Sequence, residues 1–334
     1  MRLLMMGTGP FAVPTFASLL DSEHEVVALV ARPVPPPKGR VKSPLAPMRD
    51  LAAQRGVRIL EPDDINAEES RRALTSLDFQ LLVACDYGQI LKADTLALSP
   101  LGGINLHASL LPKYRGAAPI NWAIYHGDAE TGVTVIHMTA RLDSGPCLVQ
   151  RRIPIGPDED AVQLEQRLSQ TGVDAVHAAL GMIARWDGQS PLGAPQDPAA
   201  ATKAPRLKKT DGEVDWTRSA RRITNQVRAL KPWPGTFSTW RRPQGEAMRL
   251  ILDRASVAAD TERGGRPGDV VLADKSRLLV ATGDGLLSLD RVQPAGKRAM
   301  AIDEFLRGHA VAVGDRFSAQ PSASAGTERW PTRS

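Results

Sequence analysis

Short apolar segments alternate with helical segments along the first half of the chain, and this alternation constrains the fold more than any other feature. The apolar runs have the length and β-branched content of strands, and the segments between them carry apolar residues at helical spacing. We expect strands over residues 2–6, 25–31, 57–60, 79–85, 103–107 and 132–139. We expect helices over residues 11–20, 44–55, 70–77, 118–126 and 161–185. Such an order favours an α/β fold with a Rossmann-like, mainly parallel sheet and helices on both faces.

The chain changes character after residue 187. Residues 188–206 are rich in Pro, Gly and Ala, which is typical of a linker. A helix is expected over 219–230, and short strand-like runs separated by turns follow it. Such runs favour a smaller C-terminal β-barrel, OB-like in kind. We therefore expect four parts, which are a first domain over 1–187, a linker over 188–206, a barrel domain over 207–317 and a disordered, low-complexity tail over 318–334.

Positive charge is concentrated in two parts of the chain. Between Lys203 and Arg254 there are 13 basic and five acidic residues, whereas the whole chain carries a net charge of only +5. The segment 32–42 adds four basic residues and no acidic one. Two such patches suggest a polyanionic partner, with a solvated basic surface as the alternative.

Cysteine content and apolar patterning limit the class of protein. Cys85 and Cys147 form neither a disulfide framework nor a metal-ligand spacing, which favours a reducing compartment. No apolar run approaches the roughly 20 residues of a membrane span. The strand expected at Arg2–Met6 leaves no room for a signal peptide before it. We expect a cytoplasmic protein without a metal.

A glycine pattern after the first strand raises the possibility of a dinucleotide site. Gly7, Gly9 and Ala12 have the spacing of the phosphate-binding turn. The second expected strand ends in Arg32 and lacks the acidic residue that would hold the ribose of NAD. An NADP site, with Arg32 on the 2′-phosphate, stays open as the weaker alternative. A tight strand-to-helix turn is the plainer interpretation.

Asn105 and His107 lie two residues apart at the end of an apolar strand. Residues i and i+2 of a strand share a face, so both side chains project together beyond the carboxyl end, where open α/β sheets place their sites. A lone histidine is more often a hydrogen-bonded structural residue. Asp143 follows the next expected strand, and we expect the carboxyl-end loops of neighbouring strands to meet. A carboxylate there would orient the imidazole and favour its charged form.

The chemistry that this set suggests is acyl transfer. The amide of Asn105 can donate to a carbonyl oxygen as it becomes an oxyanion. Ser109 lies on the same side but has no base of its own to activate it. Direct transfer between two bound substrates is therefore favoured over hydrolysis through an acyl-enzyme.

These residues belong to a longer motif. The run NLHASLLPKYRG starts at Asn105, and LDSG ends at Gly145. Together they resemble the folate-dependent formyltransferase family, whose motif is Asn-x-His, then Ser-Leu-Leu-Pro-x-Tyr/Trp-Arg-Gly, and later Leu-Asp-x-Gly. GTGPF at Gly7 is similar to the first turn of that family. KPWPG at Lys231 and ATGDGLLSLDRVQPAGKRAM at Ala281 resemble its methionyl-tRNA formyltransferase branch, which has a C-terminal β-barrel.

The resemblance implies a reaction and roles for three residues. The formyl group of 10-formyltetrahydrofolate, a co-substrate, would pass to the α-amino group of methionyl initiator tRNA for translation initiation. Asn105 and His107 would polarise the formyl carbonyl and stabilise the tetrahedral intermediate. Asp143 would hold and charge the histidine and help proton transfer. The resemblance implies no metal, and we expect a monomer.

The resemblance also implies binding residues for both substrates. The folate wall would comprise Ser109, Leu110, Leu111, Pro112, Tyr87, Gly88, Ile90 and Leu91, the last four mostly through backbone groups. Contacts with tRNA would come from Arg40, Lys42, Lys208, Lys209, Arg221 and Arg222. The loop 32–42, which in the family enters the acceptor stem, is unusually rich in proline here. Pro146 also departs from the polar residue that many relatives have after the Gly.

Three alternatives stay open. The same fold could formylate a small amine, either an amino sugar or glycinamide ribonucleotide. It could also hydrolyse formyltetrahydrofolate. A non-catalytic RNA-binding module is a third alternative, which the intact set of Asn105, His107 and Asp143 disfavours. The basic segment and the β-rich second half disfavour the small acceptors.

Overall fold

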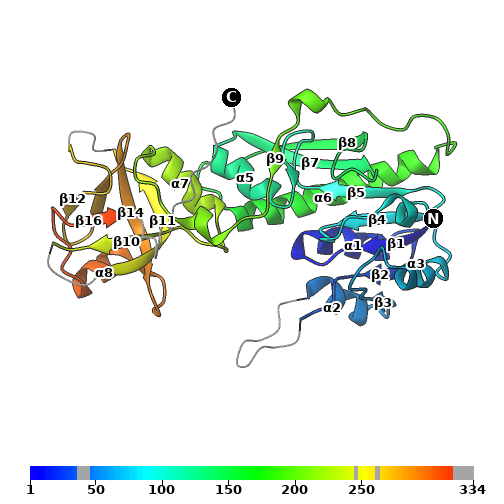
Figure 1. Cartoon of the computed structure of the whole chain (residues 1–334), viewed down its shortest axis with the longest axis horizontal. Coiled ribbons are helices and arrows are strands. Elements are labelled where there is room, and N and C mark those ends of the chain that lie inside the picture. The colour runs from blue at the N-terminus through cyan, green and yellow to red at the C-terminus, as the bar shows by residue number, and fades with distance from the viewer. Residues whose placement is uncertain (36–45, 244–246, 260–263, 319–334) are drawn as a thin grey trace, which may run out of the picture. The chain divides into compact units, whose positions relative to one another are not determined.

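The chain forms two compact units (Figure 1). This computed structural model describes residues 1–35, 46–243, 247–259 and 264–318. The first unit contains residues 1–124 and 128–206, and the second contains 125–127 and the residues from 207 onward. The segment 188–206, expected as a linker, is grouped with the first unit. Arg40, Lys42 and the expected tail beyond Ser318 lie outside the described residues.

The first unit is built on a seven-stranded sheet in its described part, with the strand order β3-β2-β1-β4-β5-β7-β8. The first five strands in that order pair in parallel, and β7 and β8 are antiparallel. Their bounds are β1 Arg2–Met6, β2 Glu25–Val30, β3 Ile59–Leu60, β4 Leu81–Cys85, β5 Gly103–His107, β7 Glu130–His137 and β8 Cys147–Pro154. The Rossmann-like, mainly parallel sheet that the strand–helix alternation predicts is confirmed.

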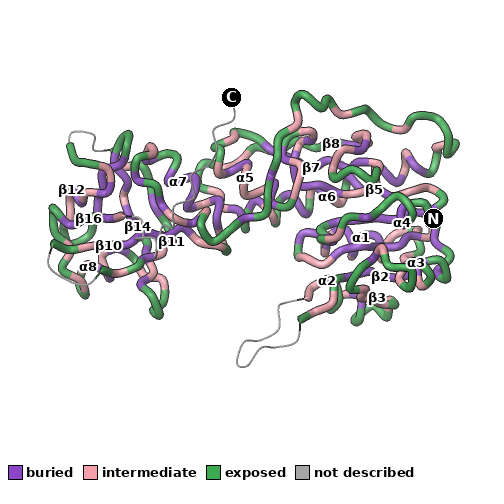
Figure 2. The backbone as a smooth tube through the Cα atoms, viewed as in Figure 1, coloured by how far each residue is buried: buried purple, intermediate pink, exposed green. Residues whose placement is uncertain are grey.

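Helices cover both faces of this sheet. One face packs on α3 and α4, since Leu4 and Leu82 of the strands share an apolar cluster with Leu74 and Leu96. The other face packs on the long helix α6. The bounds are α1 Val13–Leu20, α2 Pro47–Gln54, α3 Glu68–Thr75, α4 Ala93–Leu96, α5 Pro119–His126 and α6 Ala161–Ala184, with a 3-10 turn η1 over Pro10–Ala12. The central strands are buried on both faces because of this double cover (Figure 2).

The second unit is an antiparallel barrel-like sheet with the order β12-β13-β14-β11-β10-β16. The backbone of Asp269, the residue before β12, pairs with Arg316 of β16, so the ends of the sheet meet. The bounds are β10 Phe237–Arg241, β11 Met248–Val257, β12 Val270–Ala273, β13 Leu278–Ala281, β14 Leu286–Pro294, β15 Met300–Ala301 and β16 Arg316–Ser318, with α7 at Ala220–Ala229 and α8 at Ile302–Gly308. The predicted C-terminal barrel is confirmed.

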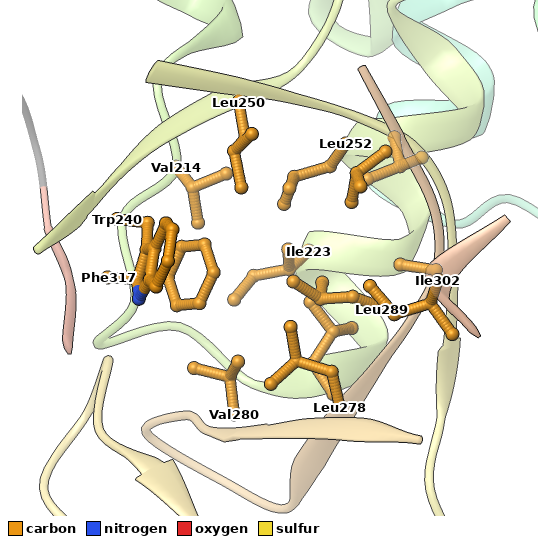
Figure 3. Close-up of a cluster of buried hydrophobic side chains, with 14 of the residues drawn as sticks. Val214, Ile223, Trp240, Leu250, Leu252, Leu278, Val280, Leu289, Ile302 and Phe317 are labelled. Carbon is orange, nitrogen blue, oxygen red and sulfur yellow. The ribbon is translucent and has the colours of Figure 1, made fainter. Parts of the chain in front are cut away.

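The core of the barrel forms around one face of α7 (Figure 3). Ile223 and Val227 of that helix are buried among strand residues such as Leu250 and Leu289. Trp240 is 1% exposed, and its indole nitrogen donates to Oδ2 of Asp315 at 3.0 Å. A buried indole N–H needs such an acceptor, so the bond lets a large ring fill the core without leaving its polar atom unpaired.

Elements with a strong apolar pattern lie within a few residues of their predicted places. The strands β1 and β5 agree at both ends with the prediction. The expected helix 44–55 is wrong at its start, since α2 begins at Pro47 and Ala46 has a non-helical backbone. The edge strand β8 was not predicted, because the polar, exposed residues of its second half hide the alternation. The short helices α4 and α8 were missed for lack of length.

The segment 188–206 is held along the first unit by backbone hydrogen bonds. Ala194 and Cys147 exchange two bonds of 2.8 Å, and β9 (Lys203–Ala204) pairs in parallel with β6 (Arg115–Gly116). Over the described residues, no helix combines the length and apolarity that crossing a membrane requires.

Candidate active site

The strand β5 presents Asn105 and His107 on one face of the sheet. Asn105 pairs with Ala84 of β4, and Ala84 belongs to the cluster under α3 and α4, so both polar side chains point to that face. Leu106 points to the other face, where a Cβ on Gly172 of α6 would come within 2.5 Å of its Cδ2. The missing side chain at position 172 lets α6 approach β5 closely. This contact sets the position of the strand that carries the polar pair.

His107 is held between a carbonyl and a carboxylate. Its Nε2 lies 2.9 Å from the carbonyl oxygen of Tyr114. A carbonyl only accepts, so Nε2 carries a proton and Nδ1 is the nitrogen left to gain or lose one. Nδ1 lies 3.7 Å from Oδ2 of Asp143, and the two side chains are 7% and 9% exposed. That distance is too long for a direct hydrogen bond.

Asp143 reaches His107 by a different path from the expected one. The expectation that the carboxyl-end loops of these neighbouring strands meet is wrong, because β7 runs antiparallel to β5. The loop after β7 instead folds back along the strand. Gly145 lies against His137, so a Cβ on Gly145 would come within 1.8 Å of the carbonyl oxygen of His137. Oδ2 of Asp143 then accepts the backbone N–H of Gly116 at 2.9 Å.

The amide of Asn105 stays available for a ligand. The residue is half-buried, and its side chain makes no hydrogen bond with any part of the chain that the structure describes. Its NH₂ group projects on the same face as the His107 ring. Two donors that converge on one point can stabilise a carbonyl oxygen as negative charge develops on it.

The polar groups of the segment after β5 are hydrogen-bonded, both within the segment and to Thr202. The buried hydroxyl of Ser109 donates to the carbonyl of Lys113 at 2.6 Å, so Ser109 is not free to act as a nucleophile. Tyr114 has a left-handed backbone with φ +65°, and its N–H donates to the hydroxyl of Thr202 at 2.8 Å. These bonds fix the Tyr114 carbonyl that holds His107.

The expected folate residues divide into buried and accessible groups. The side chains of Tyr87, Leu91, Ser109 and Leu111 are buried in the protein. Gly88 is exposed, Leu110 and Pro112 are half-buried, and the apolar side chain of Ile90 is 57% exposed. Because β4 and β5 are neighbouring parallel strands, their following loops lie at the same edge of the sheet.

Asp86 fills the first turn and argues against a dinucleotide there. A Cβ on Gly9 would come within 1.8 Å of Oδ2 of Asp86, so the carboxylate occupies the space over the glycine. A pyrophosphate in that place would meet a negative charge, and Pro10 offers it no N–H. Protein atoms crowd the carboxylate although part of the residue stays exposed, and this desolvation raises the pKa of Asp86 to about 6.

A cavity of about 340 Å³ lies beside Lys113 and Tyr114. It is lined by Leu110, Lys113, Tyr114, Asp128, Ala129, Glu130, Thr131 and Arg152. Oδ2 of Asp128 accepts from Lys113 Nζ at 2.6 Å and from the Tyr114 hydroxyl at 3.0 Å. Arg152 pairs with Glu130. The two cations of this cavity are thus neutralised by its own carboxylates.

The expected tRNA contacts in the second unit are exposed cations. Lys208 precedes the 3-10 turn η3 (Lys209–Gly212), and Lys209 is its first residue. Arg221 and Arg222 are exposed on α7, whereas Ile223 is buried. None of the four forms an ion pair within the described ranges. Unpaired exposed cations are free to meet phosphates.

Two contacts of the site are not predictable from the sequence pattern. Tyr114 acts through its backbone carbonyl. Every residue has this group, so the residue type gives no sign of the contact. Gln196 contacts the Asp143 loop from the segment 188–206, which was expected to be a linker. The linker-like composition of that segment gives no indication of a site residue. No group of His, Cys, Asp and Glu suited to a metal ion occurs among the described residues.

Comparison with known proteins places these features in a family. Residues 1–180 match "Formyl transferase" and residues 206–310 match "Formyl transferase, C-terminal domain". The chain is 44% identical to the methionyl-tRNA formyltransferase of Rhodopirellula baltica, over 96% of this chain and 97% of that protein. It is 42% identical to the methionyl-tRNA formyltransferase of Acidiphilium cryptum, over 95% of this chain and all of that protein.

Solved structures share the fold at low sequence identity. The N-formyltransferase of Helicobacter canadensis, in complex with folinic acid and dTDP-3-aminofucose, has a TM-score of 0.62 and 15% identity, over 87% of this chain and 98% of that chain. HypX of Aquifex aeolicus, in complex with tetrahydrofolic acid, has a TM-score of 0.58 and 18% identity, over 91% of this chain and 46% of that chain. With both domains matched and relatives aligned nearly end to end, the chain belongs to the methionyl-tRNA formyltransferase family.

Proposed function

We propose that this protein transfers the formyl group of 10-formyltetrahydrofolate to the α-amino group of methionyl initiator tRNA. One observation carries the proposal. Asn105 and His107 share a face at the end of β5, and Asp143 lies 3.7 Å from the imidazole. The relatives that align nearly end to end with this chain, such as the one at 44% identity, bear the name of this activity. We also propose that the enzyme is monomeric and cytoplasmic.

Asn105 and His107 act on the formyl carbonyl. The amine nitrogen attacks the formyl carbon, and a tetrahedral intermediate forms with negative charge on oxygen. The free amide of Asn105 and the ring of His107 donate to that oxygen. Because Nε2 is held by the Tyr114 carbonyl, Nδ1 is the donor, and it must be protonated when the intermediate forms.

Asp143 holds the ring and helps the proton transfers. Its carboxylate faces Nδ1 at 3.7 Å. The intermediate collapses when the bond between the formyl carbon and N10 breaks. The amine gives up one proton, N10 gains one, and the 3.7 Å between Nδ1 and Oδ2 is wide enough for a substrate group to approach both.

The folate would lie along the loops that follow β4 and β5. Exposed Ile90 and half-buried Leu110 and Pro112 offer apolar surface to a ring system. Exposed Gly88 leaves its backbone open to the pterin. The buried Tyr87, Leu91, Ser109 and Leu111 would support this wall from below. Lys208, Lys209, Arg221 and Arg222 would bind tRNA phosphates, and Arg40 and Lys42 belong to the same proposal.

A formylation assay tests the proposal. The purified chain is given 10-formyltetrahydrofolate and, separately, methionyl initiator tRNA, free methionine, an amino sugar nucleotide or glycinamide ribonucleotide. We expect formylmethionyl-tRNA and little product from the small amines. Equal turnover of free methionine would overturn the tRNA assignment. Formate release without any acceptor would identify a formyltetrahydrofolate hydrolase instead.

A further inference from the structure

One glutamine bonds to both parts of the chain that hold the His107–Asp143 pair. Nε2 of Gln196 donates to the carbonyl of Asp143 at 2.9 Å and to the carbonyl of Gly145 at 2.7 Å. Oε1 of the same amide accepts from Nε and Nη2 of Arg115, at 3.0 and 2.6 Å. All four of its bonds go to residues within or beside the proposed site.

The orientation of this amide follows from its partners. Carbonyl oxygens only accept and a guanidinium only donates, so the NH₂ group must face Asp143 and Gly145 and the oxygen must face Arg115. Only an amide of this length offers two donors and one acceptor at one side-chain end. A carboxylate in its place would turn an acceptor toward two carbonyls.

The bonds act on a backbone that needs support. Asp143 has φ +47°, in the left-handed region that non-glycine residues avoid. Gln196 restrains that residue through its carbonyl. It also restrains Arg115, whose neighbour Gly116 donates its N–H to the Asp143 carboxylate. Backbone and side chain of Asp143 are therefore held by connected contacts.

We propose that Gln196 is a positioning residue for formyl transfer, which fixes the Asp143 carboxylate against His107 by clamping the Asp143 loop to Arg115. The inference rests on the proposed function above. It assigns a role to the segment 188–206, whose composition gives no sign of one. The amide touches neither His107 nor the free donor of Asn105, so it acts only through Asp143 and Arg115.

The segment stays in place without this side chain. Ala194, two residues before, is held by its paired backbone bonds to Cys147, and β9 holds the other end. Gln196 is half-buried in a run whose neighbours are exposed. A substitution there removes the clamp and leaves the anchors of the segment intact.

The test uses two variants and a matched control in the full-length enzyme. Gln196→Met keeps the length and removes all four hydrogen bonds, and Gln196→Glu keeps the acceptor for Arg115 but removes both donors. We expect kcat to fall about 10- to 100-fold in each, with KM for both substrates within about threefold. The control is Asp197→Ala, which removes only the side-chain bond to the N–H of Ala199 in the next turn. Its kcat should stay within about twofold of the unmodified enzyme.

A double-variant cycle separates positioning from general structural damage. In the Asp143→Asn background, Gln196→Met should lower kcat by less than about threefold, because its effect passes through the missing carboxylate. An unchanged kcat in both single variants, an effect on KM alone, or a full loss in the Asp143→Asn background would each overturn the proposal. Melting temperatures of all variants are compared. If Gln196→Met does not fold, the kcat of Gln196→Glu, alone and in the Asp143→Asn background, tests the proposal.

Failure of the proposed function gives a different result. If the unmodified enzyme does not formylate methionyl-tRNA, that function is wrong. The Gln196 variants are then compared on the acceptor of the panel that is formylated, or by formate release. The clamp is contradicted only when kcat of that reaction is unaffected or when the double variant is additive.

Discussion

Nδ1 of His107 lies 3.7 Å from Oδ2 of Asp143, while Nε2 of the same ring is held by the Tyr114 carbonyl at 2.9 Å. The Tyr114 carbonyl keeps a proton on Nε2. The ring can therefore gain or lose its other proton only at Nδ1, the nitrogen that faces Asp143. The two side chains are largely shielded from water, so the carboxylate acts on the ring through a poorly screening medium.

Substitutions at this pair should lower the chemical rate. Asp143→Asn keeps the size of the side chain and an acceptor for the Gly116 N–H, so it removes the charge alone. We expect kcat for methionyl-tRNA to fall about 10²-fold or more, and a similar loss for His107→Ala, as for other positioned acid–base groups. Asp158→Asn, at an exposed site, is the control. Near-normal kcat in either site variant would show that the pair is structural.

Two glycines of α6 should respond oppositely to alanine. A Cβ at Gly172 would come within 2.5 Å of Leu106, whereas one at Gly181 meets only the Arg185 guanidinium at 3.7 Å. Gly181→Ala should raise the free energy of unfolding by about 0.5–1 kcal/mol through helix propensity. Gly172→Ala should lower it by about 1–3 kcal/mol through overpacking, and should also lower kcat by displacing β5. Urea unfolding measures the free energy of unfolding, and the formylation assay measures kcat. Equal changes in the two variants would contradict the close approach of α6 to β5.

Asp86 should make stability depend on pH. Its pKa is about 6 when folded against 3.8 for the free group, because desolvation disfavours the charged form. The unfolded chain therefore loses this proton first, so stability falls as pH rises from about 4 to about 6 and then stays low. Asp86→Asn mimics the neutral acid. Its melting temperature should match the unmodified enzyme near pH 4 and exceed it by a few degrees near pH 7.5.

A neighbouring carboxyl gives a second readout of the Asp86 charge. Burial, and then the charge of Asp86, raise the pKa of Glu165 on α6. Removing the Asp86 charge should bring the pKa of Glu165 closer to its ordinary value, which carboxyl-carbon NMR titration can follow. A melting-temperature difference between Asp86→Asn and the unmodified enzyme that is the same at pH 4 and 7.5 would rule out titration of Asp86 as its cause.

The basic residues of α7 should determine part of the salt dependence of tRNA binding. Arg221 and Arg222 are exposed and have no ion-pair partner in the described part of the chain. Changing both to Gln should weaken binding and reduce the slope of log K against log[salt] by about one per lost phosphate contact. Arg307→Gln on α8 is the control, since Arg307 is paired with Asp303 at 2.8 Å. Unaltered affinity and slope in the double variant would remove α7 from the binding surface.

The sequence by itself determines the parts of this protein that depend on neighbours in the chain. The apolar runs at Arg2–Met6 and Gly103–His107 form strands, as their short, apolar sequence patterns predict. The two-residue period of a strand places Asn105 and His107 on one face. Alternating strands and helices are enough to predict the mainly parallel sheet.

The tertiary structure alone decides what meets that strand end. The direction of β7 and the folding back of its loop bring Asp143 to His107 along a path that the strand pattern did not predict. Gln196 and the Tyr114 carbonyl join the site through contacts between distant residues and through backbone atoms. Local patterns report which face a residue prefers to bury. They carry no information on which distant hydrogen-bond partner satisfies it, because that choice depends on how all the elements pack together.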